Sequence, residues 1–161
     1  MKDEDKIQIR VATAIDATTI SNILREAFEE FKPLYTPLAF DATAITTAEV
    51  LTRIKDGVVW VALLHNSIIG TIGAVPQKDK LYIRGMGVSP SARGLGVGNK
   101  LMQQVQAYAI TNNFKALLLS TTPYLHSAIH LYEEFGFKRI SETDNSFFGT
   151  AIFQMEKVLS H

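Results

Sequence analysis

The 161-residue sequence predicts a single domain of the mixed α+β class. Strand-like apolar runs alternate along it with segments of helical spacing, and no internal repeat or low-complexity tract separates them. The clearest part is residues 81–120, which are expected to form a strand, a loop, a helix and a second strand in that order. A chain of this length buries roughly 68–70% of the surface that its unfolded form exposes, so it can fold without a disulfide or a structural metal. We therefore expect residues 1–161 to form one domain.

The first half of the chain is predicted to hold a strand, two helices and a hairpin. Residues 7–11 alternate between apolar and polar side chains, as a half-buried strand does. After Asp16, an expected N-cap, apolar residues recur at helical spacing from Ile20 to Phe31. The segments expected next are an irregular loop through residues 33–37, a short helix between a capping box at residues 46–49 and Gly57, and a hairpin of residues 58–64 and 68–75.

The second half is predicted to hold two helices between strands. Residues 81–88 form a strand that contains Gly85 and Gly87, and glycine inside a strand often marks a bulge or a backbone that something else approaches closely. The other segments expected are a loop at residues 89–93, a helix over 96–112, a buried strand at 116–120, a helix over 128–135 closed by Gly136, and two closing strands at 137–140 and 147–157.

The charge balance and the lack of cysteine narrow the classes of function. Lys and Arg number 16 and Asp and Glu number 16, so the formal net charge is zero. Because nucleic-acid binding depends on a positive field, we expect no nucleic-acid partner. The absence of cysteine excludes a disulfide framework, a thiolate metal site and a covalent cysteine nucleophile. We find neither a secretory signal nor a stretch of about 20 apolar residues, and expect a cytoplasmic protein with no membrane partner.

The most informative stretch is the glycine-rich loop at residues 88–98, Val-Ser-Pro-Ser-Ala-Arg-Gly-Leu-Gly-Val-Gly. It lies between a predicted strand and a predicted helix, whose start offers unpaired N–H groups and the positive end of the helix dipole. Glycines allow the backbone to turn tightly and to approach a ligand, so the loop suits an anion and most naturally a phosphate. The alternative is a tight turn whose glycines only pack the helix on the sheet.

Two common nucleotide-binding fingerprints do not fit this loop. A P-loop ends in Gly-Lys-Ser/Thr, whereas the sequence here is Gly98-Asn99-Lys100-Leu101. A Rossmann loop has the spacing Gly-x-Gly-x-x-Gly and an acid about 20 residues later that holds the ribose. Residues 114–120 contain no acid, so both ATP and NAD are disfavoured.

Three motifs and a closing strand, in the family's order, resemble those of the GNAT superfamily of N-acetyltransferases. Arg93-Gly94-Leu95-Gly96-Val97-Gly98 is similar to its pyrophosphate loop, Arg/Gln-x-x-Gly-x-Gly/Ala, and Val88-Ser89-Pro90 resembles the Val-x-Pro that ends its fourth strand. Residues 128–137 resemble its Ala-x-x-Leu-Tyr-x-x-x-Gly-Phe helix. Residues 155–159 are similar to its usual closing strand.

The resemblance covers residues 81–159 in the family's order, and the elements expected at residues 7–75 are compatible with it. It implies a mixed, mostly antiparallel central sheet of about seven strands. Helices would flank the sheet on both faces, and the sheet would be splayed between the fourth and fifth strands. It also implies acetyl-CoA as the cosubstrate, no metal, and by analogy a homodimer.

The resemblance assigns cofactor contacts to the fourth strand, the loop and the second helix. The backbone at Met86 and Val88 would pair with the pantetheine arm, and the Met86 N–H would face the thioester carbonyl oxygen. Leu125 replaces a polar Asn of many relatives, so only an apolar contact is expected there. Arg93 either adds charge at the pyrophosphate or is a solvated loop residue. The cofactor-binding residues implied are Met86, Gly87, Val88, Arg93, Gly94, Leu95, Gly96, Val97, Gly98, Leu125, Ala128 and Tyr132.

Met86 and Tyr132 are the catalytic residues that the resemblance implies. A phenol with a pKa near 10 stays protonated at neutral pH, so Tyr132 can protonate the departing thiolate of CoA. From periodicity alone, Tyr132 is equally a core residue of an apolar helix stripe. Many relatives carry a glutamate base on the fourth strand, but residues 81–88 contain no acid, and Tyr82 and Arg84 stand there instead. Deprotonation of the amine through water, or by a residue elsewhere, is then expected, and His126 is more often a cap or a surface residue.

The acceptor is expected to be a primary amine of a small molecule or a peptide, and it attacks directly in a ternary complex. The regions that set its specificity would be residues 28–40, where Tyr35 either lines a pocket or packs the loop, and residues 144–148. The acids Glu26, Glu29 and Glu30 either attract a cationic amine or only solubilise their helix. Two other functions remain open: a regulatory module that binds acyl-CoA without turnover, and a nucleotide-binding domain.

Overall fold

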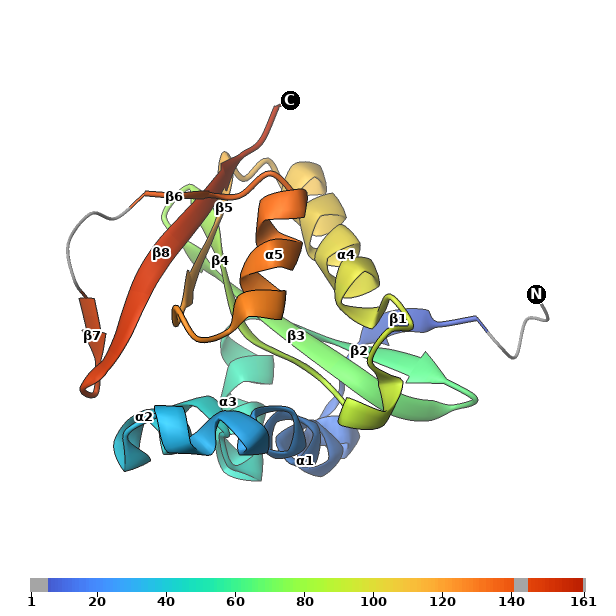
Figure 1. Cartoon of the computed structure of the whole chain (residues 1–161). Coiled ribbons are helices and arrows are strands. Elements are labelled where there is room, and N and C mark those ends of the chain that lie inside the picture. Colours follow the sequence, from blue (N-terminus) through green and yellow to red (C-terminus); the bar gives the residue numbers. More distant parts are fainter. Residues whose placement is uncertain (1–5, 141–144, 161) are drawn as a thin grey trace.

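The computed structural model describes residues 6–140 and 145–160 (Figure 1). The strands are β1 (Gln8–Val11), β2 (Val58–Leu64), β3 (Ser67–Gln77), β4 (Lys80–Val88), β5 (Ala116–Thr121), β6 (Lys138–Arg139), β7 (Asn145–Phe147) and β8 (Thr150–Val158). The α-helices are α1 (Ala17–Phe28), α2 (Pro37–Thr43), α3 (Thr47–Asp56), α4 (Val97–Thr111) and α5 (His126–Glu134), and the 3₁₀ turns are η2 (Ala14–Asp16), η3 (Glu29–Leu34) and η4 (Pro90–Ala92).

The strands of the described residues form one mixed sheet in the order β1-β2-β3-β4-β5-β8-β6, and β7 pairs with β8. All pairs are antiparallel except β4 with β5, which is parallel. The mixed, mostly antiparallel sheet is therefore as predicted. It has eight strands instead of about seven, because the predicted closing strand at residues 147–157 is a hairpin that turns at Phe148 and Gly149.

Helices cover both faces of the sheet (Figure 1), as predicted. The alternation of side chains along β2 shows how each face is buried. Trp60 and Ala62 belong to the core under α4 and α5, where the Trp60 ring meets the Tyr108 ring edge to face at 5.2 Å. Val59 and Val61 point the other way, into the core formed with α1 and α3. The sheet is therefore held by two apolar layers, one on each face.

The sheet opens between β4 and β5. These strands pair over only three residues each, Lys80–Tyr82 with Ala116–Leu118. Beyond Tyr82 the rest of β4 pairs with β3 alone, and the end of β5 pairs with β8. The predicted splay between the fourth and fifth strands is therefore confirmed. It exposes the backbone edge of β4 at the place where the resemblance puts a ligand.

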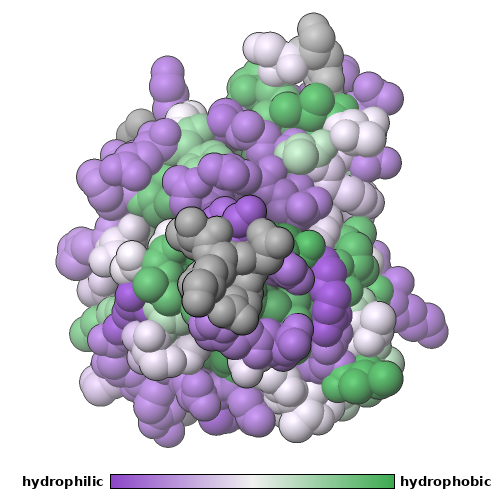
Figure 2. Space-filling view, turned by 90° about the vertical axis from the view of Figure 1, so that its right-hand side faces the viewer, coloured by the Kyte–Doolittle hydropathy of each residue, from purple (hydrophilic) through white to green (hydrophobic). Residues whose placement is uncertain are grey.

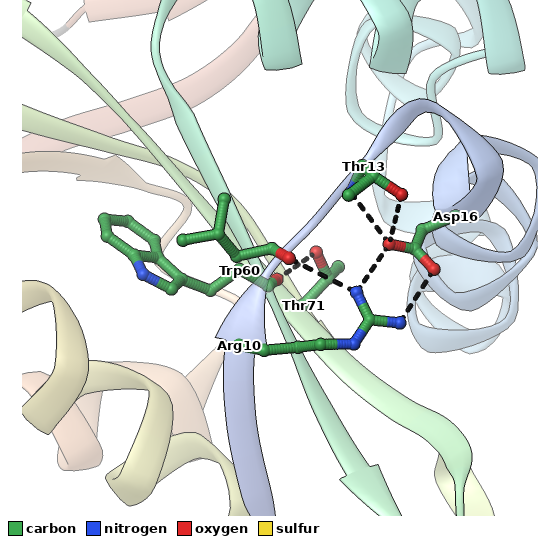
Figure 3. A network of polar contacts seen from close by, with 6 residues as sticks. Arg10, Thr13, Asp16, Trp60 and Thr71 are labelled. Carbon is green, nitrogen blue, oxygen red and sulfur yellow. Dashed lines mark hydrogen bonds and ion pairs between the residues drawn. The ribbon is translucent and has the colours of Figure 1, made fainter.

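The start of α1 differs from the prediction in its contacts. Asp16 is the N-cap residue of α1, as predicted, but its side chain makes no capping hydrogen bond there. Its carboxylate instead accepts a hydrogen bond from the backbone N–H of Thr13 at 2.8 Å, as part of the capping box of η2. The same carboxylate accepts two hydrogen bonds from the Arg10 guanidinium, at 2.7 and 3.0 Å (Figure 3). Nearby, the Thr71 hydroxyl donates to the Trp60 carbonyl at 2.9 Å and ties β3 to β2. Asp16 thus anchors the entry of α1 to β1.

The predicted irregular loop at residues 33–37 is shorter than expected, because only Tyr35 and Thr36 lie outside a helix or a 3₁₀ turn. Residues 29–34 form η3, and α2 begins directly at Pro37. The Thr36 hydroxyl oxygen accepts the Ala39 N–H at 3.2 Å, so Thr36 is an N-cap followed by a proline at the first helical position. Proline is tolerated there because its missing N–H would have no helical partner. These residues therefore start a helix that lies below the sheet in Figure 1.

Hydrophilic side chains spread over most of the face in Figure 2, and hydrophobic ones lie among them in small groups. Across residues 6–140 and 145–160, no helix combines the length and the apolar character needed to cross a membrane.

Candidate active site

A cavity of about 310 Å³ lies where β4 and β5 diverge. Its walls come from the middle of β4, the end of β5 and the start of α5. The segment that holds η3 and α2 closes it from another side, together with α3 and Phe147 of β7. Of the predicted acceptor segment 144–148, Phe147 lines this cavity and Asp144 lies outside the described residues.

The β4 wall of the cavity contains a β-bulge. Thr71 of β3 pairs with Gly87 and Gly73 pairs with Arg84, so the two residues Gly85 and Met86 lie opposite Ile72 alone. Gly85 has φ +71°, a left-handed conformation that side chains other than glycine rarely adopt. A bulge leaves the extra residue out of the strand ladder. Met86 therefore stands at an interrupted ladder in the wall of the cavity.

Tyr132 of α5 lines the same cavity. Its side chain is buried, and its ring packs against Phe137 with ring centres 6.0 Å apart. Its hydroxyl forms no hydrogen bond with the part of the chain that the structure describes. Burial raises the pKa of this phenol well above its ordinary value, and the nearby Tyr35 raises it further. Tyr132 is therefore a neutral hydroxyl whose proton is free for a bound molecule.

The start of α5 also contributes to the cavity. Leu125 is the N-cap residue of α5 and lines the cavity with an apolar side chain. Ala128 packs against the main core and is not part of the lining. His126 is exposed and does not line the cavity either. It is therefore no base for an amine bound there.

The glycines of the loop differ in what requires them. Gly94 and Gly96 have φ +84° and +77°, and a β-carbon on either would meet nothing within 4 Å, so the conformation and not packing requires glycine. Gly96 is the N-cap of α4 and offers no side-chain hydrogen bond, so no side chain caps the first N–H groups of α4. Gly98 is different, because a β-carbon there would lie 3.1 Å from the Leu131 side chain of α5.

The remaining loop residues are split between surface and core. Arg93 is half exposed and forms an ion pair with Glu30 of η3, so it is not a bare solvated residue. Leu95 is half exposed, whereas Val97 is buried in the main core. On β4, Val88 packs against that core from a half-buried position. The remaining strand glycine, Gly87, faces α1, where a β-carbon would lie 3.1 Å from the Leu24 side chain and 3.3 Å from that of Ala27.

Residues that no motif predicted complete the cavity. Arg53 of α3 and Thr122 after β5 both line it, together with Tyr82 and Arg84 of β4. The helical spacing carried one signal for Arg53, because it lies three residues after the buried Val50 and thus on the inner side of α3. No pattern in the sequence predicts that Thr122 lines the cavity.

The charge in the cavity is positive. Burial lowers the pKa of the Arg53 guanidinium, and the positive charge of Arg84 lowers it further. The described residues of the lining include no Asp, Glu or His. The geometry thus brings together a bulged strand, a neutral phenol and two guanidinium groups. The described lining offers hydrogen-bond donors.

Solved structures with the same fold are numerous. With a TM-score of 0.80 and 18% identity, the chain matches the coenzyme A complex of PaiA N-acetyltransferase from Thermoplasma acidophilum, over 96% of this chain and 99% of that one. A GNAT-family acetyltransferase of Staphylococcus aureus Mu50 matches with a TM-score of 0.80 and 20% identity, over 96% and 100%. These likenesses establish the fold.

Curated relatives share the sequence over part of their length. The chain is 35% identical to the N-acetylaspartate synthetase of Danio rerio over 88 residues, which are 53% of this chain and 31% of that protein. It is 32% identical to the human N-acetyltransferase 8B over 95 residues, 55% of this chain and 40% of the relative. The chain therefore spans well under half the length of these relatives. The model of the family described as "Acetyltransferase (GNAT) family" matches residues 18–137, which include Met86, the glycine loop and Tyr132. The chain therefore belongs to the GNAT acetyltransferase family, as its three motifs indicated.

Proposed function

We propose that this protein transfers an acetyl group from acetyl-CoA to a primary amine, by direct attack of the amine while both molecules are bound. One observation carries the proposal: Met86 at the β4 bulge and the neutral phenol of Tyr132 line one cavity, at the place where the sheet splays. An oxyanion donor and a proton donor beside one cavity suit acyl transfer from a thioester.

The features around the cavity fit the two ends of acetyl-CoA. Beyond Tyr82, β4 has no partner in β5, so its backbone is available to the pantetheine arm. The uncapped start of α4, with open space at Gly94 and Gly96, suits the pyrophosphate. A structure with the same fold, the PaiA N-acetyltransferase, was solved as a coenzyme A complex.

In the proposed reaction the amine nitrogen attacks the thioester carbonyl carbon. The C–N bond forms, the C–S bond breaks, and the backbone N–H at Met86 stabilises the oxygen that becomes negative. Tyr132 gives its proton to the departing sulfur, and solvent returns a proton to the phenol. The amine gives up its own proton to water, because the described lining residues include no Asp, Glu or His. The products are an N-acetyl amine and CoA.

The curated relatives suggest a first acceptor to test. Several of them are named as N-acetylaspartate synthetases, so aspartate is the acceptor with which we propose to begin. A binding module without turnover is the second candidate. The lack of a base in the described wall of the cavity favours it.

Tyr132→Phe tests the proposal. The rate constant kcat should fall by about 10²–10⁴-fold, the usual contribution of a positioned acid, while the Kd of acetyl-CoA stays the same. Tyr124→Phe is the matched control, because Tyr124 is 40% exposed and does not line the cavity. A Tyr132→Phe enzyme with kcat within twofold of the wild type would remove Tyr132 as the acid. Binding of acetyl-CoA with no acetylation of any amine would favour the binding module.

A further inference from the structure

Two arginines meet in the wall of the cavity, and they come from separate elements. Arg53 lies in the last turn of α3, and Arg84 lies on β4 just before the bulge. The Arg53 guanidinium reaches over the strand, where its Nη1 atom lies 2.6 Å from the position that a β-carbon on Gly85 would occupy. It therefore stands beside the bulge and one residue away from Met86.

Neither arginine is neutralised by the described part of the chain. No ion pair or side-chain hydrogen bond joins Arg53 or Arg84 to any residue among 6–140 and 145–160. Glu49, the acid one turn before Arg53, forms no ion pair with it. Its carboxylate accepts the Thr46 N–H at 3.1 Å in the capping box of α3, although its negative charge still raises the pKa of Arg53 against the larger effects of burial and of Arg84. Partly buried charges are usually paired. Two guanidinium groups therefore face one cavity, and the described lining contains no acidic residue that could balance their charge.

A third donor lies in the same wall. The hydroxyl of Thr122 is buried, with only 3% of the residue exposed. Its neighbour in the cavity is Tyr35; burial raises the pKa of the Tyr35 phenol, and the interaction with the Thr122 hydroxyl opposes that rise. Buried hydroxyls nearly always have a partner, so Thr122 is a donor that a ligand in the cavity can also engage.

We propose that the acceptor amine carries a carboxylate, and that Arg53 and Arg84 bind this carboxylate while Thr122 donates to it or to its neighbouring polar atom. This proposal rests on the proposed function and names the substrate class of the same site. Guanidinium groups recognise carboxylates by two parallel hydrogen bonds, which fixes orientation as well as affinity. A carboxylate held over Gly85 places an amine two or three bonds away next to Met86.

The size of the cavity limits the acceptor to a small molecule. About 310 Å³ is at the lower end of the range for ligand sites, and the acetyl-thioester end must share it. An acidic amino acid, with two carboxylates and one amine, fits the two cations and the small volume. Net positive charge in the wall disfavours polyamines and lysine side chains as acceptors, because both would add a like charge.

The first experiment compares initial rates for three amines of nearly equal size: aspartate, asparagine and aspartic acid diamide. The value of kcat/KM should fall by about 10-fold or more at the step that replaces the bound carboxylate by an amide, as the loss of a charged hydrogen bond implies. Arg53→Gln and Arg84→Gln should lower kcat/KM for aspartate by the same order and leave the diamide within about threefold. The Kd of acetyl-CoA should not change in either variant. Lys55→Gln, an exposed cation two residues further along α3, is the matched control and should change neither substrate.

The second experiment uses the wild-type protein and measures binding instead of acetyl transfer. Succinate has two carboxylates and no amine, so it should bind to the wild-type protein with CoA present, as measured by calorimetry, and should compete with the acceptor. If succinate fails to bind and the diamide is acetylated as well as aspartate, the carboxylate site is wrong although the acetyltransferase proposal stands. If succinate binds through Arg53 and Arg84 but no amine is acetylated, the carboxylate site stands and the proposed function falls.

Discussion

Arg93, at the start of the glycine loop, forms an ion pair with Glu30 of η3. The two side chains are each about half exposed, with 48% and 49% of their area open to solvent. The pair joins the loop proposed for the pyrophosphate to the helical turn that leads into the acceptor side of the cavity. Arg93 is therefore paired with an acid from another element, although it belongs to the loop proposed to hold the pyrophosphate.

Glu30→Gln should release Arg93 for the cofactor. We expect the Kd of acetyl-CoA to fall about two- to fivefold, the equivalent of an exposed ion pair of ~0.4–1 kcal/mol. Glu29→Gln removes an equally exposed acid for which the structure shows no ion pair, and it should leave the Kd unchanged. Calorimetric titration measures both. An equal effect of the two variants would mean that only general charge matters.

Gly85→Ala should impair the acceptor site as well as the fold. An added β-carbon would lie 2.6 Å from Arg53 Nη1, and the positive φ of +71° costs an alanine roughly 1–2 kcal/mol. Gly136→Ala is the matched control, because Gly136 has φ +95° and faces only the flexible Lys157 side chain, no closer than 3.6 Å. Denaturant unfolding should show similar losses of stability in both variants. Only Gly85→Ala should raise the KM of the acceptor, and a normal KM would separate Arg53 from substrate binding.

The buried phenol of Tyr132 should make the protein sensitive to alkali. Its pKa is raised in the folded state, so above the ordinary value of 10.0 the unfolded chain releases a proton that the folded chain keeps. Stability should therefore fall as pH rises above about 10, by up to ~1.4 kcal/mol per pH unit for this one group. Tyr132→Phe should show a shallower fall between pH 10 and 11.5, measured by urea unfolding. Tyr124→Phe should follow the wild type, and identical slopes in all three proteins would contradict the burial of Tyr132.

Asp16 should make the protein sensitive to acid. Its hydrogen bonds from Arg10 hold the pKa of the carboxyl below its ordinary value of 3.8, since they outweigh the opposing effect of burial. The stabilisation is complete above the unfolded value and is lost as pH falls through the folded one. Asp16→Asn should cost about 1.5–3 kcal/mol at pH 7, as the loss of charged hydrogen bonds does, and should flatten the fall of stability below pH 4. Asp41→Asn, at an exposed site on α2, is the control. A wild-type slope in Asp16→Asn would assign the acid sensitivity to another group.

The local patterns of the sequence were sufficient to predict most strands of the sheet and the position of the glycine loop. The hairpin at residues 58–75 was predicted because His65 and Asn66 sit between two apolar runs, and both have the positive φ of a tight turn. The β7–β8 turn was missed because Phe148 takes φ +50°, which few residues other than glycine, asparagine and aspartate adopt. The start of α2 was missed because two prolines suggested a loop, whereas Thr36 and Pro37 are a cap and a first helical residue.

The residues of the candidate site also divide into those that local sequence patterns predict and those that they do not. Met86 and Tyr132, which line the cavity, could be named from the sequence because each lies in a motif of adjacent residues, and the loop's role stays a prediction. Arg53 and Thr122 could not be named in this way, since they reach the cavity only after α3 and the end of β5 are folded against β4. Arg84 was noticed only as a departure from an expected acid. The three residues that carry the proposed substrate class are therefore set by tertiary structure.

Thermal unfolding with acetyl-CoA, CoA, NAD and ATP at matched concentrations is the most direct test that the protein binds acetyl-CoA where β4 and β5 diverge. A ligand that binds only the native state at about 100 times its Kd adds ~2.7 kcal/mol, or about 5–10 °C at roughly 2–4 °C per kcal/mol. We expect this rise in unfolding temperature with acetyl-CoA and with CoA, and no rise with NAD or ATP. No rise with acetyl-CoA or CoA, or a larger one with NAD or ATP, would contradict an acetyl-CoA site at the β4–β5 splay.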